Sequence, residues 1–233
     1  PNAALNLPLV DHFDVLAYDQ RGLGQTDKPP GPYTMAGYAQ DAIAVMDAYG
    51  WQRAHVVGYS FGGMVAQELA IRHPERIDKL VLGATSAGGA GGSSFPLHTL
   101  QDLPPRERAR RAMEVSDLSF TPEWQQSNPE QAEQRLDARV AQLTRFADEP
   151  GRRDGELAQL EARSHHDTYD RLDRIGAPTL VVAGSRDGQA PKAAGQALAE
   201  RIRDCRFEVH EGSHAMIQEN PDVCQSIIAF LTS

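Results

Sequence analysis

The chain has little cysteine, no excess of basic charge and no long apolar run. Cys205 and Cys224 are the two cysteines among 233 residues, so a disulfide framework is excluded and a reducing cytoplasm is the expected location. The 23 Lys and Arg residues are outnumbered by 32 Asp and Glu residues, and the net charge of -9 argues against a nucleic acid or an anionic membrane as partner. No apolar segment approaches the roughly 20 residues that cross a bilayer. The length fits one core with an inserted subdomain.

Strand-like and helix-like patterns alternate along most of the chain. Short apolar runs predict buried strands, and the amphipathic segments between them predict helices. Thr34 is a candidate N-cap for a helix that runs to Tyr49 and is closed by Gly50. The expected strands are 13–18, 54–58, 77–83, 179–183 and 206–210, and further helices are expected at 61–73, 192–202 and 222–231. This alternation predicts an α/β fold with a doubly wound, mainly parallel sheet and helices on both faces.

The segment 58–63, Gly-Tyr-Ser-Phe-Gly-Gly, is the most informative motif. It follows the apolar run 55–57 and precedes an amphipathic helix, so Ser60 lies where a strand must turn sharply into a helix. We expect the glycines at 58 and 62 to leave room for neighbouring backbone in this turn. Such a turn exposes the serine hydroxyl above the sheet as a nucleophile. The alternative is that Ser60 is a turn serine with a packing role.

Two later strands lead into loops that carry the groups a serine nucleophile needs. Asp187 follows the strand expected at 179–183, and His214 follows the strand expected at 206–210. An imidazole that titrates near neutrality takes and returns the serine proton, while a carboxylate orients the ring. The alternatives are that Asp187 caps the next helix, that His214 is an ordinary loop histidine, or that His210 is the base, although His210 falls inside its strand.

Several separated motifs resemble the α/β-hydrolase superfamily, in the branch of small esterases and 3-oxoadipate enol-lactonase-like proteins. The order Ser60, Asp187, His214 is the order of that superfamily. Thr26 stands where the family's D-x-R-G-x-G-x-S-D loop usually has serine. The resemblance covers most of 13–92 and 171–233, and its motifs are 15–27, 58–63, 74–82, 177–184 and 212–221.

The resemblance also implies what the start of the chain lacks. In the family, an earlier part supplies the first strands and a His-Gly loop that helps form the oxyanion hole. Here the chain opens at 1–5, which we interpret as the helix before the strand expected at 13–18, so we expect an N-terminal truncation. The Phe61 N–H would then be one oxyanion donor without its partner. Losing one such donor typically lowers turnover by roughly a hundredfold to a thousandfold.

Between 85 and 169 no strand pattern occurs. A glycine-rich exit, 88–94, leads to polar helical segments, which are expected at 106–115, 129–146 and 156–164. We interpret 93–170 as a helical cap over Ser60, with the core formed by 1–92 and 171–233. A cap of this kind shapes the substrate pocket and excludes water. Phe61, Met35 and Trp124 are candidate substrate-binding residues, each with ordinary core packing as the alternative.

Other features do not indicate a cofactor or metal. The glycines at 88–92 are not followed by Lys-Ser or Lys-Thr, so a phosphate loop is not predicted. The basic run 106–111 is interpreted as a solvated helix face. The adjacent His165 and His166 point different ways on most backbones, and no third ligand is evident. We expect His166 and Asp167 to fasten the end of the cap to the core.

The predicted function is hydrolysis of a small carboxylic ester or lactone through an acyl-Ser60 intermediate, without cofactor or metal. His214 acts as base and Asp187 as orienting acid. Carbon–carbon bond hydrolysis and cofactor-free perhydrolysis, which some relatives perform with the same three residues, are alternatives. A non-catalytic ligand-binding homologue is the alternative from a different class. Dehalogenase and epoxide-hydrolase activities are disfavoured because those relatives usually place an aspartate at the position of Ser60.

Overall fold

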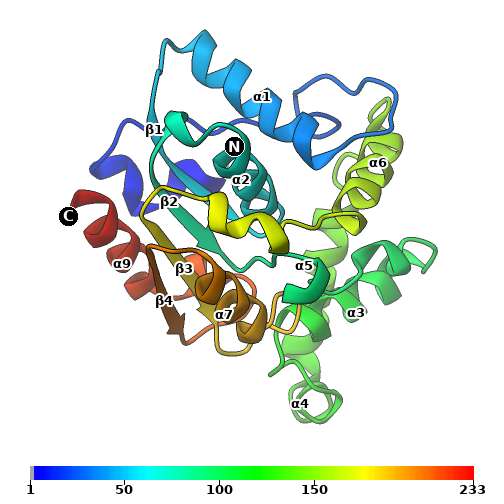
Figure 1. The fold of residues 1–233 in the computed structure, drawn as a ribbon. Coiled ribbons are helices and arrows are strands. Elements are labelled where there is room, and N and C mark those ends of the chain that lie inside the picture. The colour runs from blue at the N-terminus through cyan, green and yellow to red at the C-terminus, as the bar shows by residue number, and fades with distance from the viewer. Residues whose placement is uncertain (1–2) are drawn as a thin grey trace.

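The computed structural model describes residues 3–233, and this part of the chain contains a four-stranded sheet of order β1-β2-β3-β4 (Figure 1). Every neighbouring pair of strands is parallel. The strands are β1 (Ala54–Tyr59), β2 (Ile77–Gly83), β3 (Thr179–Gly184) and β4 (Cys205–His210). Because the strands are parallel, their carboxyl ends lie at one edge of the sheet, where the loops that follow them meet.

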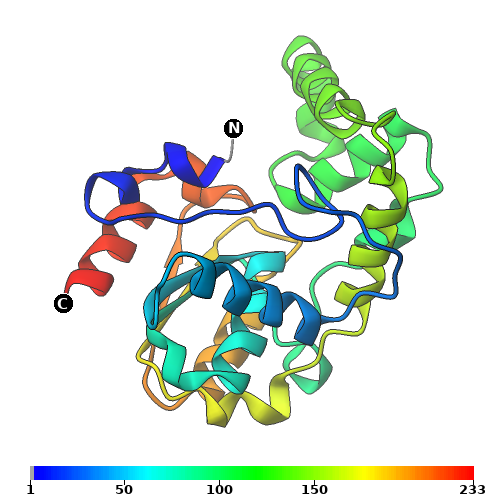
Figure 2. The ribbon, with the colours of Figure 1, turned by 90° about the horizontal axis from the view of Figure 1, so that it is seen from above.

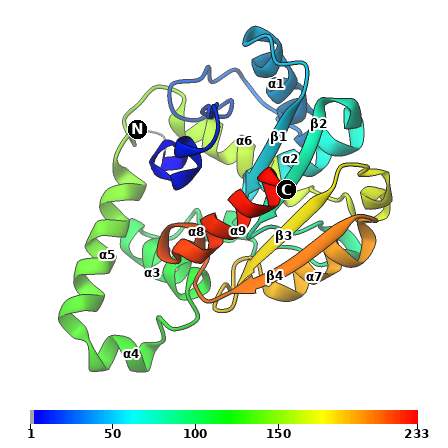
Figure 3. The same ribbon diagram turned by 90° about the vertical axis from the view of Figure 1, so that its left-hand side faces the viewer.

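Helices cover both faces of the sheet, as the alternating pattern predicts (Figure 3). One face is covered by α1 (Met35–Ala48), α2 (Phe61–Arg72) and α7 (Lys192–Arg201). The other face is covered by α8 (Met216–Glu219) and α9 (Pro221–Thr232). The Thr34 side chain caps α1 by accepting a hydrogen bond from the Gly37 N–H at 3.0 Å, as expected from the sequence.

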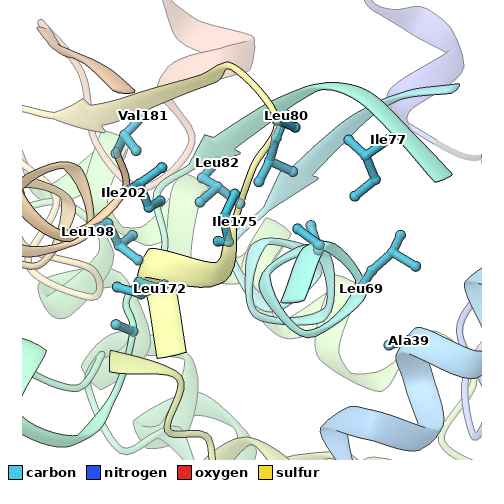
Figure 4. Close-up of a cluster of buried hydrophobic side chains, with 14 of the residues drawn as sticks. Ala39, Leu69, Ile77, Leu80, Leu82, Leu172, Ile175, Val181, Leu198 and Ile202 are labelled. Carbon is cyan, nitrogen blue, oxygen red and sulfur yellow. The ribbon is translucent and has the colours of Figure 1, made fainter. Parts of the chain in front are cut away.

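The two faces have separate apolar cores because side chains alternate along a strand. Leu80 and Leu82 of β2 point toward α2 and α7 and share one apolar cluster with Leu69 and Leu198 (Figure 4). Val81, between them in sequence, packs on the opposite side with the residues of α9. Both faces of the central strands are therefore buried, which explains why these strands appear in the sequence as continuous apolar runs.

The expected strand at 13–18 is not a strand in the structure. The segment is extended, but none of its residues pairs with another described residue in a ladder. Phe13 and Val15 instead pack side-on against the α9 core. Apolar residues in alternation satisfy this packing without a paired neighbour, so the sequence pattern alone overestimates the strand. The expected N-terminal helix is replaced by short 3-10 helices, Ala3–Asn6 and Pro8–Asp11, and positions 1–2 lie outside the described residues.

Residues 93–170 form a helical segment beyond the carboxyl ends of the strands (Figures 1 and 2). Its α-helices are α3 (Pro105–Ser116), α4 (Pro122–Ser127), α5 (Pro129–Thr144) and α6 (Arg152–Ser164). The short helix α4 was not predicted, although Thr121 provides an N-cap and Pro122 occupies the first helical position. Further 3-10 helices lie at Pro74–Arg76, Gly89–Gly91, Leu97–Leu100 and Tyr169–Arg174. In residues 3–233 no helix is both long and apolar enough to cross a membrane.

Candidate active site

Ser60 lies in the turn between β1 and α2 with a strained backbone. Its φ of 53° and ψ of -117° lie outside the regions that a side chain normally allows, a conformation that costs about 1–3 kcal/mol. The Ser60 N–H donates to the Gly83 carbonyl at 2.8 Å, and the Ser60 carbonyl accepts from the Gly63 N–H at 2.9 Å. These bonds hold the turn to β2 and to the first turn of α2, so the surrounding fold maintains the strain.

The glycines that this turn requires are only partly those expected. A Cβ at Gly58 would lie 2.6 Å from the Gly62 carbonyl oxygen, and a Cβ at Gly63 would lie 2.6 Å from the Thr85 Cβ. Neither space admits a side chain. Outside its own helix backbone, a Cβ at Gly62 would meet the Gln20 Nε2 at 4.0 Å as its nearest atom, so the expected crowding at position 62 is wrong and falls on position 63 instead.

The structure brings together Ser60, His214 and Asp187 from three separate loops. The Ser60 Oγ lies 2.8 Å from the His214 Nε2, and the His214 Nδ1 lies 2.8 Å from the Asp187 Oδ2. The Asp187 side chain is fully buried, while 15% of the His214 side chain is exposed. The carboxylate is thus inside the protein, whereas Ser60 and His214 are both only partly buried, which suits attack on an incoming carbonyl carbon.

Asp187 uses its two carboxylate oxygens differently. Its Oδ2 contacts His214, whereas its Oδ1 accepts 2.8 Å hydrogen bonds from the backbone N–H groups of Gln189 and Ala190. The N-cap residue of α7 is Pro191, so Asp187 stabilises its own loop and does not cap that helix. The two backbone donors fix the carboxylate and direct its second oxygen at the imidazole.

His214 is held on both sides by the backbone and by Tyr59. The His214 N–H donates to the Ser116 carbonyl at 2.7 Å, and the His214 carbonyl accepts from the Tyr59 hydroxyl at 2.7 Å. Burial raises the pKa of Tyr59 well above its ordinary value, so this hydroxyl stays a neutral donor. The rival histidine, His210, contacts Glu208 at 3.0 Å within β4, and no contact joins it to Ser60 among the described residues.

Gln189 is a residue of this site that the sequence reasoning missed. Its side chain is buried, and its Nε2 lies 2.7 Å from the His214 Nε2, the same nitrogen that faces Ser60. Its Oε1 accepts from the Ser116 hydroxyl at 3.3 Å. The available signal was its position two residues after Asp187 in the acid-bearing loop. Polarity alone does not separate such a glutamine from an exposed loop residue.

The three predicted substrate-binding residues lie in two places. Met35 and Phe61 belong to one apolar cluster, in which the Phe61 ring meets the Tyr38 ring edge-on at 5.1 Å. Trp124 packs instead on Phe120 within the helical segment, at 5.5 Å between ring centroids. Met35 and Phe61 are thus neighbours of the turn that carries Ser60, whereas Trp124 belongs to a different aromatic pair.

His166 and Asp167 contact the segment 86–88, which follows β2. His166 is 6% exposed, and its Nε2 lies 3.2 Å from the Ser86 carbonyl oxygen. Burial lowers its pKa to about 4, so His166 is neutral at physiological pH. Asp167 pairs with Gly88 in an isolated β-bridge. Within residues 3–233, no group of three or more His, Cys, Asp or Glu side chains is arranged to hold a metal ion.

Two cavities adjoin these elements. The larger, of about 510 Å³, lies between the start of α1 and the end of α6. The smaller, of about 180 Å³, lies between α2, the segment 86–98 and the end of α6. Neither lining includes Ser60, Asp187 or His214, so the described cavities flank the site and do not contain the reacting atoms.

Comparison with known proteins agrees with this architecture. Residues 2–221 match the family described as alpha/beta hydrolase fold. A 3-oxoadipate enol-lactonase from Acinetobacter baylyi is 33% identical over 215 residues, which are 91% of this chain and 75% of that protein. A putative carbamate hydrolase, RutD, from Caulobacter segnis is 31% identical over 96% of this chain and 83% of its own length. The crystal structure of the enol-lactonase from Burkholderia xenovorans has a TM-score of 0.76 at 28% identity, and the match covers 97% of this chain and 83% of that one.

The chain therefore belongs to the α/β-hydrolase family. It is a hydrolase, and its similarity to enol-lactonases agrees with the resemblance noted in its sequence.

Proposed function

We propose that this hydrolase cleaves a small carboxylic ester or lactone through an acyl-Ser60 intermediate. The observation that carries the proposal is the line of two 2.8 Å contacts that runs from the Ser60 Oγ through the His214 ring to the Asp187 Oδ2. A nucleophile, its base and the group that orients the base are the minimum set for acyl transfer by serine.

Acylation begins when the Ser60 Oγ attacks the substrate carbonyl carbon. The His214 Nε2 takes the serine proton and then donates it to the leaving alkoxide or enolate oxygen. Asp187 accepts from the Nδ1–H throughout, which keeps the Nε2 lone pair directed at Ser60 and stabilises the imidazolium. In a lactone the leaving oxygen stays attached to the acyl chain, so ring opening gives a single acyl-enzyme.

The negative charge on the carbonyl oxygen is stabilised at the start of α2. Phe61 is the first residue of that helix, and its N–H is a candidate oxyanion donor at the positive end of the helix dipole. Deacylation repeats the same steps with water, which His214 deprotonates for attack on the acyl carbon. Phe61 and Met35, in one apolar cluster beside the turn that carries Ser60, are the candidates to contact the acyl group.

The helical segment, residues 93–170, acts as a cap that covers a core of residues 1–92 and 171–233. Three backbone hydrogen bonds support this position of the cap over the site, because each joins the helical segment to a loop that bears the acid or the base. They are His214 N–H to Ser116 O at 2.7 Å, Leu118 N–H to Arg186 O at 2.9 Å and Phe95 N–H to Gln189 O at 2.7 Å.

Carbamate hydrolysis is a second candidate, favoured by the similarity to putative carbamate hydrolases. Ser60 would attack the carbamate carbonyl and form a carbamoyl-serine, so the same three residues serve both reactions. A substrate panel of matched phenyl acetate, phenyl carbamate and lactone separates the two candidates by kcat/KM.

Labelling by a fluorophosphonate, read by intact mass, tests the nucleophile directly. We expect the wild type to gain one adduct, Ser60→Ala to gain none, and a control change at the exposed serine of α4, Ser127→Ala, to label like the wild type. Ser60→Ala should also lose ester turnover with little change in Tm. Turnover retained by Ser60→Ala would contradict the nucleophile assignment, and an unlabelled wild type would contradict its activation.

A further inference from the structure

Two hydrogen-bond donors converge on one nitrogen of the His214 ring. The His214 Nε2 lies 2.8 Å from the Ser60 Oγ and 2.7 Å from the Gln189 Nε2. The Asp187 carboxylate, which only accepts, lies 2.8 Å from the Nδ1, so the hydrogen of the neutral ring is on the Nδ1. The Nε2 then carries the lone pair, and each group that faces it must donate. The part of the Gln189 amide that faces His214 is therefore its NH2 group.

The acid-bearing loop and the helical segment hold Gln189 in this position. The residue is 7% exposed, its backbone N–H donates to the Asp187 Oδ1 at 2.8 Å, and its backbone carbonyl accepts from the Phe95 N–H at 2.7 Å. The Oε1 of its side chain accepts from the Ser116 hydroxyl at 3.3 Å. The oxygen end of the amide thus has its own donor, and the nitrogen end stays directed at His214. A donor that is fixed before the reaction needs little reorganisation during it.

The amide nitrogen of Gln189 has more donor capacity than the site uses without substrate. A primary amide nitrogen carries two hydrogens, and within residues 3–233 the hydrogen-bond partner of this one is the His214 Nε2 alone. That partner has a single lone pair in the ring plane, which the Ser60 hydroxyl also needs. A buried donor without a full acceptor is unfavourable. An underused donor therefore lies directly beside the reacting atoms.

Proton transfer to His214 removes the acceptor of this donor. When the Ser60 Oγ bonds to the substrate carbon, its proton moves to the Nε2, and the lone pair there is lost. The Gln189 N–H then faces another N–H. In the next step the Nε2 proton passes to the leaving oxygen as the bond between the substrate carbon and that oxygen breaks. To receive this proton, the leaving oxygen must lie within hydrogen-bond reach of the Nε2, which brings it beside the Gln189 NH2 group.

We propose that Gln189 is a catalytic residue that donates a hydrogen bond to the leaving oxygen of the substrate. It transfers no proton, and it stabilises the negative charge on the leaving alkoxide or enolate oxygen until the proton from His214 arrives. Before the reaction the same N–H shares a neutral acceptor with Ser60, whereas in the transition state it faces a charged oxygen, which forms the stronger bond. An interaction that strengthens in the transition state accelerates the chemical step. This inference rests on the proposed serine hydrolase function.

The basicity of the leaving group decides how much a substrate depends on Gln189. A p-nitrophenolate spreads its charge over the ring and departs without help, so attack by Ser60 limits acylation. A simple alkoxide, the leaving group of an alkyl ester or a saturated lactone, holds its charge on one oxygen and requires stabilisation there. Loss of the Gln189 donor should therefore slow acylation more as the leaving group becomes more basic.

A purely structural role for Gln189 makes a different prediction. Its side chain also connects the acid-bearing loop to Ser116, the last residue of α3. If that connection were its whole role, replacement would lower kcat/KM by the same factor for every leaving group. If its N–H only competed with Ser60 for the Nε2, replacement would raise kcat/KM by the same factor for every leaving group. The dependence on leaving group therefore separates the catalytic role from both of these.

The test compares kcat/KM for p-nitrophenyl, phenyl, trifluoroethyl and ethyl acetate, in order of increasing basicity of the leaving group. These esters form the same acyl-enzyme, so differences in kcat/KM report acylation. Gln189→Met keeps the length of the side chain and removes the donor. We expect little loss with the p-nitrophenyl ester and a loss of about tenfold to a hundredfold with the ethyl ester, the effect of a hydrogen bond to a charged group. The control Gln126→Met, at an exposed glutamine of α4, should behave as the wild type with all four esters.

Gln189→Glu provides a second variant in case methionine disturbs the loop. Glutamate has the same shape as glutamine, but its ionised carboxylate only accepts and places a negative charge beside the leaving oxygen. The loss with the ethyl ester should be at least as large as for Gln189→Met. Changes in kcat/KM that are equal for all four esters in both variants would overturn the proposal.

Fluorophosphonate labelling of Ser60 separates failure of this inference from failure of the proposed function. Equal changes for all four esters in variants that still label at Ser60 would overturn the role of Gln189 and leave the serine hydrolase function standing. A wild type that neither labels nor hydrolyses any of the esters would overturn the function, and the role of Gln189 with it.

Discussion

Replacement of Asp187 by asparagine should leave the fold intact and nearly abolish turnover. The Oδ1 position accepts from two backbone N–H groups at 2.8 Å, so the oxygen of an asparagine amide must stay there. The amide nitrogen then occupies the Oδ2 position, 2.8 Å from the His214 Nδ1, and donates to it. This selects the tautomer with hydrogen on Nε2, which cannot accept the Ser60 proton. We expect kcat to fall by up to about ten-thousandfold.

The stability effect of the same change should be modest. Asparagine keeps both backbone bonds and replaces the charge-assisted bond to His214, which contributes about 1.5–3 kcal/mol, with a neutral one, which contributes about 0.5–1.5 kcal/mol. The assay is kcat with p-nitrophenyl acetate together with Tm by circular dichroism. The matched control is Asp170→Asn, at an aspartate whose side chain is 92% exposed, and it should change neither quantity. A fall of only a few-fold in kcat for a folded Asp187→Asn would refute the role assigned to this carboxylate.

Two further predictions concern the scaffold around the site. Burial alone would raise the pKa of Glu68, but its hydrogen bonds from Arg171 and a second arginine outweigh burial and lower that pKa below its ordinary value of 4.5. A carboxyl group whose pKa is lowered in the folded state stabilises the fold at pH values above its unfolded-state pKa, and this stabilisation is lost as pH falls through its folded-state pKa. Glu68→Gln should therefore reduce Tm at neutral pH, and the difference in Tm from the wild type should shrink below about pH 4.5. A difference in Tm that persists unchanged in acid would contradict the ion-pair explanation. Gly63→Ala should lower Tm because the new Cβ would meet Thr85 at 2.6 Å. Gly62→Ala has open space for its Cβ and should keep or raise Tm, because alanine has the better helix propensity. Equal losses of Tm in the two variants, measured by thermal unfolding, would contradict the packing argument.

Much of the sheet was predictable because its signals are local. The four observed strands were expected to within one residue at each end, since a buried parallel strand must be apolar on both faces. The cap of α1 by Thr34 was likewise predictable, because a capping hydrogen bond spans three residues. The conformation of the segment 13–18 was not predictable in this way. Whether the segment forms a strand depends on whether another segment lies beside it, and no local pattern carries that information.

The candidate site divides along the same line. By itself, the sequence determined that Ser60 lies in a strand-to-helix turn and that Asp187 and His214 lie in loops after later strands, because parallel strands end at a common edge. Only the tertiary structure decided that the Asp187 oxygens divide between His214 and the loop backbone, and that Gln189 shares the His214 Nε2 with Ser60. Each of these depends on distances between side chains far apart in the chain, and such distances are set by packing.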